Sequence, residues 1–150
     1  MLENASTVLV IGTGFLGSAL VDLFAKNRWT VHAASYSGGD NEVACDLGDE
    51  SSVAALASEF GQVDVVIHCA SSGRGKGIEG YRAVYRDGTA HLAKHFPHSH
   101  LIYTSSSSVY GQVNGEVVSE ESETSPIAET SEVLLEAEAN IIHSHGTALR

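Results

Sequence analysis

The amino-acid sequence predicts an α/β fold, a doubly wound parallel sheet of about five to six strands in three α/β/α layers. Short runs rich in β-branched residues alternate with stretches of helical period, which is typical of strand–helix–strand units around a parallel sheet. A glycine-rich turn joins the first such run to the first helical stretch. The 150 residues suffice for one buried core but not for two, so residues 1–150 are predicted to form one domain.

Short apolar runs bounded by polar or glycine-containing segments predict the strands. The runs span residues 7–12, 30–35, 42–47, 63–71, 101–105 and 147–150. Asn114-Gly115 lies near valines after the fifth run. Because Asn and Gly both accept positive φ, this dipeptide predicts a small β-hairpin at that point.

Segments of helical period predict helices over residues 15–27, 50–60, 78–96 and 127–143. Asp49 stands directly before the second of these segments and is predicted to cap the helix N-terminus. The first helix carries an apolar stripe that should pack on the sheet. This stripe consists of Leu16, Ala19, Leu20, Leu23 and Phe24.

Composition and charge exclude several classes of protein. With 43% hydrophobic and 18% charged residues, and no apolar run near the roughly 20 residues of a membrane span, the chain is expected to be soluble. The N-terminus lacks the basic region of a signal peptide, so we expect a cytoplasmic protein whose Cys45 and Cys69 stay unpaired. The formal net charge of -11 argues against nucleic acid, because phosphate backbones are bound by clustered Lys and Arg.

The turn after the first strand has G-x-G-x-x-G spacing, formed by Gly12, Gly14 and Gly17. In such a turn the first glycine permits the tight bend, the second lets the backbone approach a pyrophosphate, and the third lets helix and strand pack closely. The helix N-terminus adds N–H groups and a partial positive charge. The sequence therefore predicts a dinucleotide site, the alternatives being a structural glycine turn or a degenerate, empty site.

The choice between NAD and NADP depends on the end of the second strand, about 20 residues after the glycine turn. An acid there holds the ribose hydroxyls of NAD, and a nearby Arg accepts the 2′-phosphate of NADP. This chain has Ser35, Tyr36 and Ser37 instead, which neither repel nor grip a phosphate. The sequence leans slightly to NADP.

Five segments are notable beyond their spacing, namely GTGFLG, CDLGDESSV, VIHCASSG, YRAVYRDGTAHL and YTSSSSVYG. Together they resemble the extended or atypical branch of the short-chain dehydrogenase/reductase superfamily, the NAD-dependent epimerase/dehydratase family. The resemblance covers nearly the whole chain and implies a Rossmann-type fold and an oxidoreductase acting on a nucleotide sugar or a small carbonyl compound. It also implies an adenine contact at Asp46 and Leu47, and the expected cofactor-binding residues are Gly12, Thr13, Gly14, Phe15, Leu16, Gly17, Ser35, Asp46, Leu47, Ala70 and Ser71.

The serine run resembles the family motif Ser-Ser-x-x-Val-Tyr-Gly, which aligns the family's catalytic Ser or Thr with Ser106. A hydroxyl at the C-terminal end of a strand can donate a hydrogen bond to a substrate carbonyl or alkoxide while hydride moves. Serines at a strand end can also do no more than satisfy backbone groups, and this alternative stays open.

The chain departs from the family at the Tyr-x-x-x-Lys pair that works with this serine. The resemblance places the two positions at Thr130 and Leu134, and neither side chain can supply a phenol or lower its pKa. Ser106 is then the only catalytic-type group expected, with Tyr110 as the nearest alternative phenol. A non-catalytic NAD(P)-binding module, or a scaffold that binds neither cofactor, is the alternative function.

The remaining features give weaker expectations. Family members continue after the sixth strand with a substrate-binding lobe, so we expect the C-terminal substrate-binding part to be absent from this chain and its open sheet edge to favour a homo-oligomer. The histidines of HFPHSH fit no metal-binding spacing, so no metal site is expected. His68 is expected to pack in the core, and the loop carrying Arg74 and Lys76 either touches cofactor or substrate or is simply flexible.

Overall fold

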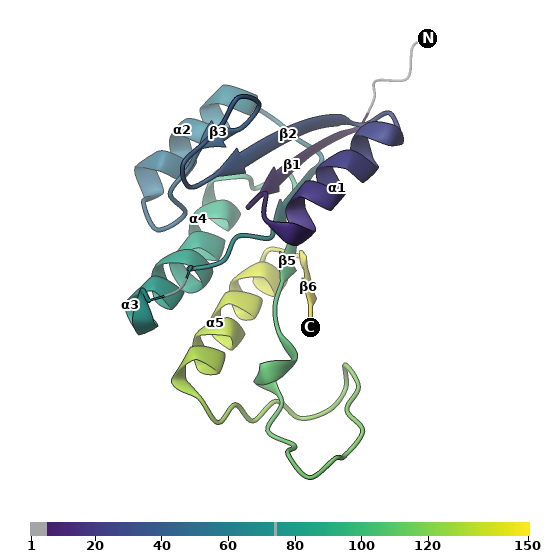
Figure 1. Cartoon of the computed structure of the whole chain (residues 1–150), viewed down its shortest axis with the longest axis vertical. Helices are drawn as coiled ribbons and strands as arrows, with labels where there is room; N and C mark the ends of the chain where they lie inside the picture. Colours follow the sequence, from purple (N-terminus) through teal and green to yellow (C-terminus); the bar gives the residue numbers. More distant parts are fainter. Residues whose placement is uncertain (1–5, 74) are drawn as a thin grey trace.

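The computed structural model describes residues 6–73 and 75–150 and confirms the predicted α/β fold (Figure 1). In this part of the chain six parallel strands form one sheet in the order β3-β2-β1-β4-β5-β6. The strands are β1 (Thr7–Ile11), β2 (Thr30–Ser35), β3 (Val43–Ala44), β4 (Val65–His68), β5 (His100–Thr104) and β6 (Thr147–Leu149). The strand order reverses between β1 and β4, and ligands of such sheets bind at the carboxyl edge beside the reversal.

The helices follow the predicted segments with one exception, described below. They are α1 (Phe15–Lys26), α2 (Glu50–Phe60), α3 (Gly77–Tyr81), α4 (Gly88–His95) and α5 (Glu129–His143), with a π-helical segment η1 (Arg82–Asp87) and a 3₁₀ turn η2 (Ser107–Val109). The predicted cap of α2 is confirmed, because the backbone N–H of Ser51 donates to Asp49 Oδ1 at 2.9 Å. Among the described residues, no helix is both long and apolar enough to cross a membrane.

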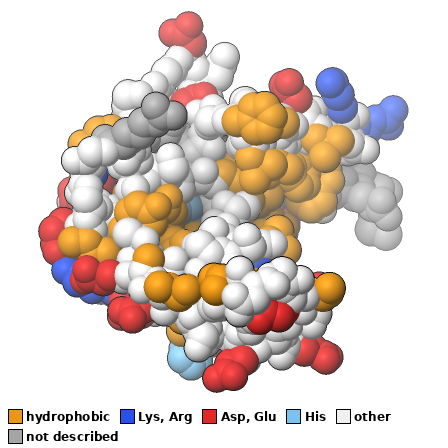
Figure 2. Space-filling model, turned by 60° about the horizontal axis from the view of Figure 1, so that its bottom comes forward, with side chains coloured by type: hydrophobic (Ala, Val, Ile, Leu, Met, Phe, Trp, Pro, Cys, Tyr) orange, Lys and Arg blue, Asp and Glu red, His pale blue; other side chains and the backbone are white. Residues whose placement is uncertain are grey.

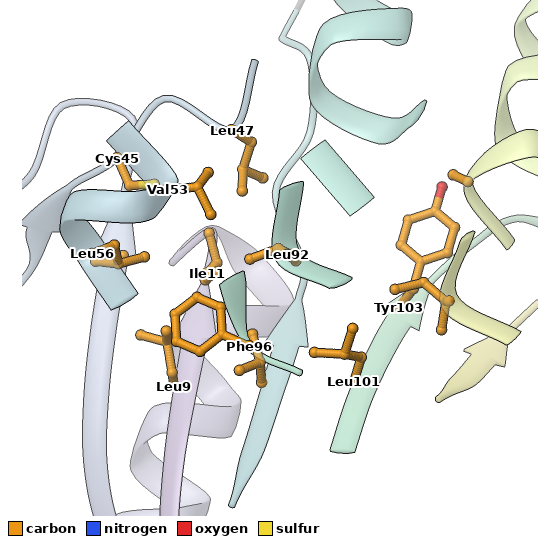
Figure 3. Packing of buried hydrophobic residues seen from close by; sticks show 14 of the residues in the cluster. Leu9, Ile11, Cys45, Leu47, Val53, Leu56, Leu92, Phe96, Leu101 and Tyr103 are labelled. Atoms are coloured by element: carbon orange, nitrogen blue, oxygen red, sulfur yellow. The ribbon is translucent and has the colours of Figure 1, made fainter. Parts of the chain in front are cut away.

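Alternate residues of β1 face two different cores. Leu9 and Ile11 join the larger cluster, which α2, α4 and α5 cover, and Figure 3 shows Phe96 packing beside them. Val8 and Val10 face the opposite side, where they pack with residues of α1. Each of these four side chains is at most 1% exposed. Burying one such side chain stabilises the fold by roughly 1.5–3 kcal/mol, so β1 anchors the sheet and the turn that follows it.

The apolar stripe of α1 is only partly buried, which corrects the sequence prediction. Leu16 is 46% exposed and Leu23 is 55% exposed, whereas Leu20 and Phe24 pack against the smaller core. The helix packs mainly on β1 and β2. The periodicity therefore predicted the helix correctly and overestimated how much of its surface the described residues cover.

The predicted helix 78–96 is interrupted by η1, where the chain takes wider π-helical turns. Side chains of the next helical turn and of other elements contact backbone carbonyls of this segment. His68 Nε2 lies 2.9 Å from Val84 O, Thr89 Oγ1 donates to Tyr85 O at 2.6 Å, and Asn140 Nδ2 donates to Arg86 O at 2.9 Å. Such π-turns are frequent at functional sites, and this one lies beside both cavities described below.

The predicted hairpin at Asn114-Gly115 is wrong. Gly115 does have a positive φ of 83°, but the only pairing described in this loop is an isolated antiparallel bridge between Tyr110 and Thr124. Val113 is 71% exposed and Val117 is 97% exposed. A two-stranded ribbon needs an apolar face to cover, and these valines cover none, so the turn forms without its ladder.

Candidate functional site

The glycine turn has the geometry that its spacing predicts. Gly12 has a φ of 93°, and a Cβ at this position would overlap the backbone of Ala70. A Cβ on Gly17 would overlap the carbonyl oxygen of Gly12, so the third glycine allows α1 to pack closely on the turn. Among the described residues, no atom outside the neighbouring residues and the helix backbone lies within 4 Å of the place that a Cβ on Gly14 would take. The second glycine thus borders open space, as approach by a ligand requires.

The N-terminus of α1 opens onto this space. Gly14 is the N-cap residue and offers no side chain to the first N–H groups of the helix, and the first turn contains no acid. Unpaired N–H groups and the helix dipole favour an anion at such a position. Phe15, the first residue of the helix, is 100% exposed.

A cavity of about 300 Å³ lies beside the glycine turn, between the loops that follow β1, β2 and β4. Six of the eleven predicted cofactor-binding residues line this cavity, namely Gly12, Ser35, Asp46, Leu47, Ala70 and Ser71. The other five, which are not among its lining residues, form the rest of the glycine turn and the start of α1. These are Thr13, Gly14, Phe15, Leu16 and Gly17. The structure therefore brings residues from four separate predicted segments to one place.

Polar contacts hold the walls of this cavity. Asp46 Oδ1 accepts a hydrogen bond from Gly48 N at 2.9 Å, which turns the chain into α2. Lys76 Nζ lies 4.4 Å from the ring centroid of Tyr36, so that a cation–π contact joins the loop after β4 to the loop after β2. Both side chains line the cavity. Arg74, which the sequence placed in the same loop, lies outside the described residues.

The serines of the run have separate roles. Ser105 Oγ donates to the buried carboxylate of Glu138 at 2.6 Å, which makes Ser105 a structural residue. Ser106 is the N-cap of η2, and its Oγ accepts from the backbone N–H of Ser108 at 3.1 Å. Ser108 Oγ in turn accepts from Ser131 at 3.1 Å, whereas Ser107 is exposed. Among the described residues no acceptor is found for the Ser106 hydroxyl hydrogen, so it can be donated to a ligand.

A second, smaller cavity of about 130 Å³ contains the serine predicted to be catalytic. Its lining residues include Ser106 together with Thr130 and Leu134, the positions to which the resemblance assigned the missing Tyr and Lys. The three positions therefore meet, but two of the three side chains lack the required chemistry. Phenols do line the cavity from another direction, on Tyr81 and Tyr85.

The tyrosine phenols near this cavity are weak acids. Burial raises the pKa of Tyr85, whose oxygen accepts from Ser72 N at 3.4 Å. Tyr103 is fully buried, its hydroxyl points toward α5 in Figure 3, and burial raises its pKa as well. Tyr110, the alternative phenol suggested by the sequence, lies elsewhere, because its hydroxyl donates to Ser119 O at 2.9 Å and it lines a different cavity. The structure does not bring Tyr110 to Ser106.

His68 packs in the core beside Tyr85 and Tyr103, as the sequence predicted. Burial lowers its pKa from the ordinary value of 6.5, so the folded protein keeps this imidazole neutral. The unfolded chain binds the proton more readily, and below about pH 6.5 this difference destabilises the fold by up to about 1.4 kcal/mol per pH unit.

We expect the free energy of unfolding of the wild type to fall more steeply than that of His68→Gln as the pH is lowered from 7 to 5. Glutamine retains a donor for Val84 O and does not titrate. Urea titrations of the two proteins at several pH values measure the difference. Parallel pH profiles would show that His68 does not titrate in the expected manner.

An ion pair with one buried partner lies at the outer end of the sheet. Glu138 on α5 has a side chain that is 3% exposed, and Arg150 beyond β6 donates to its Oε2 from Nη2 at 2.7 Å. Arg150 Nη1 also donates to the Tyr110 hydroxyl at 3.2 Å. The sequence did not reveal this pair, because nothing local distinguishes Glu138 from the other glutamates of α5.

A strand, a glycine turn and a helix at the switch point of a parallel sheet, with a cavity alongside, define the Rossmann-type class of dinucleotide-binding folds. The model of the NAD dependent epimerase/dehydratase family matches residues 8–133. The chain therefore belongs to this family. A comparison with curated proteins found no match.

Solved structures show the same fold. WbmG from Bordetella bronchiseptica, in complex with NAD, shares 16% sequence identity with this chain and superposes with a TM-score of 0.84. The match covers 99% of this chain and 54% of WbmG. UDP-glucose 4-epimerase from Brucella ovis, in complex with NAD, is 24% identical with a TM-score of 0.76, over 93% and 47%. A short-chain dehydrogenase/reductase superfamily protein from Agrobacterium tumefaciens, with bound NAD, is 21% identical with a TM-score of 0.77, over 90% and 44%. The chain thus spans about half the length of these proteins.

Proposed function

We propose that this chain is the cofactor-binding part of an NAD(P)-dependent oxidoreductase. One observation carries the proposal: the open glycine turn at the α1 N-terminus is continuous with a cavity lined by six independently predicted residues. Family membership supports it, as do the similar folds that hold NAD. Calorimetric titration with NAD and NADP tests it, and the absence of binding by both nucleotides would contradict it.

The residues around the glycine turn fit a dinucleotide. The N–H groups at the start of α1 would face its pyrophosphate, and Asp46 and Leu47 would contact the adenine in the cavity. A bound nicotinamide supplies the hydride chemistry. Within this chain, the Ser106 hydroxyl would donate a hydrogen bond to the oxygen of the carbonyl or alkoxide group that reacts.

We propose a nucleotide sugar or a small carbonyl compound as the substrate. The fold of this chain resembles that of UDP-glucose 4-epimerase from Brucella ovis, an enzyme named for a nucleotide sugar. Within the chain, the cavity around Ser106 supports this proposal, because it lies on the same carboxyl edge as the proposed cofactor site.

Replacing Ser106 by alanine is expected to lower the rate of hydride transfer about a hundredfold or more, because one hydrogen-bond donor to the reacting oxygen is removed. Nicotinamide absorbance with UDP-glucose and related sugar nucleotides measures the rate, and calorimetry should show unchanged cofactor affinity. Ser107→Ala, which removes an exposed hydroxyl next in the chain, is the matched control. Equal rates for Ser106→Ala and the wild type would refute this role.

A specific observation favours a second function, a module that binds NAD(P) without turning over a substrate. Thr130 and Leu134 line the cavity of Ser106 at the positions where the family has its Tyr and Lys, and neither can act as an acid or base. Cofactor binding without hydride transfer to any tested carbonyl compound would support this alternative.

We further propose that the chain self-associates through the free edge of its sheet. β6 is last in the strand order, and within the described residues it pairs only with β5. Apolar side chains also form patches on the face shown in Figure 2, and Leu149 of β6 is 52% exposed. An unpaired edge with apolar surface nearby is a template for pairing with another chain, which light scattering would detect.

A further inference from the structure

A carboxylate that the sequence did not single out lies beside the glycine turn. Thr13, the residue between the first two glycines, donates from Oγ1 to Glu42 Oε2 at 2.7 Å, across 29 positions of sequence. The backbone of Glu42 is also held, because Gly39 N donates to Glu42 O at 3.0 Å and Glu42 N donates to Gly39 O at 3.3 Å. Hydrogen bonds thus hold both the backbone and the carboxylate of Glu42.

The sheet topology places this carboxylate at the end of β2. Glu42 directly precedes β3, whose Val43 pairs with Ala34 of β2, and Thr13 follows β1 on the other side of β2. The hydrogen bond between Glu42 and Thr13 therefore crosses over the carboxyl end of β2, where Ser35 lies. This is the position at which Rossmann-type folds carry the acid that accepts hydrogen bonds from the adenosine ribose.

Glu42 therefore supplies the charge that the end of β2 itself lacks. A carboxylate at this place accepts hydrogen bonds from the 2′- and 3′-hydroxyls of NAD and repels the 2′-phosphate of NADP. Lys76, which lines the cavity, contacts the Tyr36 ring, and no ion pair between Lys76 and Glu42 is found in the described part of the chain.

We propose that Glu42 makes the site selective for NAD over NADP, a role that rests on the cofactor binding proposed above. The slight lean to NADP was drawn from the absence of an acid at Ser35, and Glu42 removes that argument. Glu42 could not be recognised from the sequence, because it lies in the loop before β3 and not at the end of β2.

The test compares the dissociation constants of NAD and NADP for the wild type, Glu42→Gln and Asp40→Asn. Glutamine keeps an acceptor for Thr13 and removes the charge. Asp40 is an exposed acid in the same loop, and no contact of its side chain with the glycine turn is found among the described residues, so its variant controls for the loss of one negative charge. Thermal unfolding verifies that each variant is folded.

The wild type should bind NAD at least about tenfold more tightly than NADP. Glu42→Gln should reduce this ratio about tenfold, chiefly by tightening NADP, while Asp40→Asn should leave the ratio within about twofold. An unchanged ratio in Glu42→Gln would overturn the inference and leave the proposed function standing. A wild-type preference for NADP that is lost in Lys76→Met would have the same consequence. Absence of binding of both nucleotides by the wild type would overturn both.

Discussion

Replacing Gly14 by aspartate should abolish dinucleotide binding while leaving the fold as stable as the wild type. Gly14 is the N-cap residue of α1, with a φ of −71° that any residue can adopt. A new Cβ would meet no other part of the described chain within 4 Å, apart from its neighbours and the helix backbone. Aspartate is a favoured N-cap residue, so its carboxylate would accept from the first free N–H groups of the helix and stabilise it by up to a few tenths of a kcal/mol. The same carboxylate would occupy the anion position at the helix N-terminus and repel a pyrophosphate.

Calorimetry should therefore show a loss of affinity of about a hundredfold or more for both NAD and NADP, equivalent to roughly 2.7 kcal/mol. The midpoint of thermal unfolding without nucleotide should be unchanged or slightly raised. Gly12→Ala is the informative contrast, because its Cβ would overlap the backbone of Ala70 and should destabilise the fold. Retained affinity in a folded Gly14→Asp protein would mean that the nucleotide binds elsewhere.

Replacing Arg150 by methionine should destabilise the fold by about 3 kcal/mol, because it leaves the carboxylate of Glu138 buried without its cation. The side chain of Glu138 is 3% exposed, and that of Arg150 is 23% exposed. Ser105 would remain as a donor to the carboxylate, which places the expected loss at the lower end of the range for broken buried pairs. Denaturant titration measures the free energy of unfolding.

The double variant Glu138→Leu with Arg150→Met separates loss of the pair from loss of packing. Removing both charges should recover a large part of the stability, since replacing a whole buried ion pair by apolar side chains is often neutral or stabilising. Arg82→Met, which removes ion pairs with the exposed carboxylates of Glu79 and Glu129, should change the stability by less than about 1 kcal/mol. A double variant as unstable as Arg150→Met alone would show that the buried charge is not the cause.

Local patterns predicted those features of the fold that local physics determines. The G-x-G-x-x-G spacing predicted a turn whose first glycine has a positive φ, and β2 begins and ends at the predicted residues 30 and 35. The cap at Asp49 was equally predictable, because an Asp directly before a helical segment can accept from the free backbone N–H groups of the first turn. Each of these features depends on a few neighbouring residues.

Features that depend on distant partners could not be predicted in this way. The π-helical turns of η1 are accompanied by side-chain partners such as His68 and Asn140, from other strands and helices. The hairpin failed for the opposite reason, since Asn114-Gly115 formed its turn without a face for the flanking valines. In the candidate site, Glu42 and Thr13 meet across 29 positions, and no local motif marks such a contact.

The central claim is that the glycine turn and the adjoining cavity hold a dinucleotide. Titrating NAD into the isotope-labelled chain and following its backbone amide resonances tests this directly. We predict saturable shifts at Gly12–Gly17, Ser35, Asp46–Leu47 and Ala70–Ser71, with little change in the outer loop 111–128. Absence of saturable shifts, or shifts confined to residues away from the glycine turn, would contradict the proposed site.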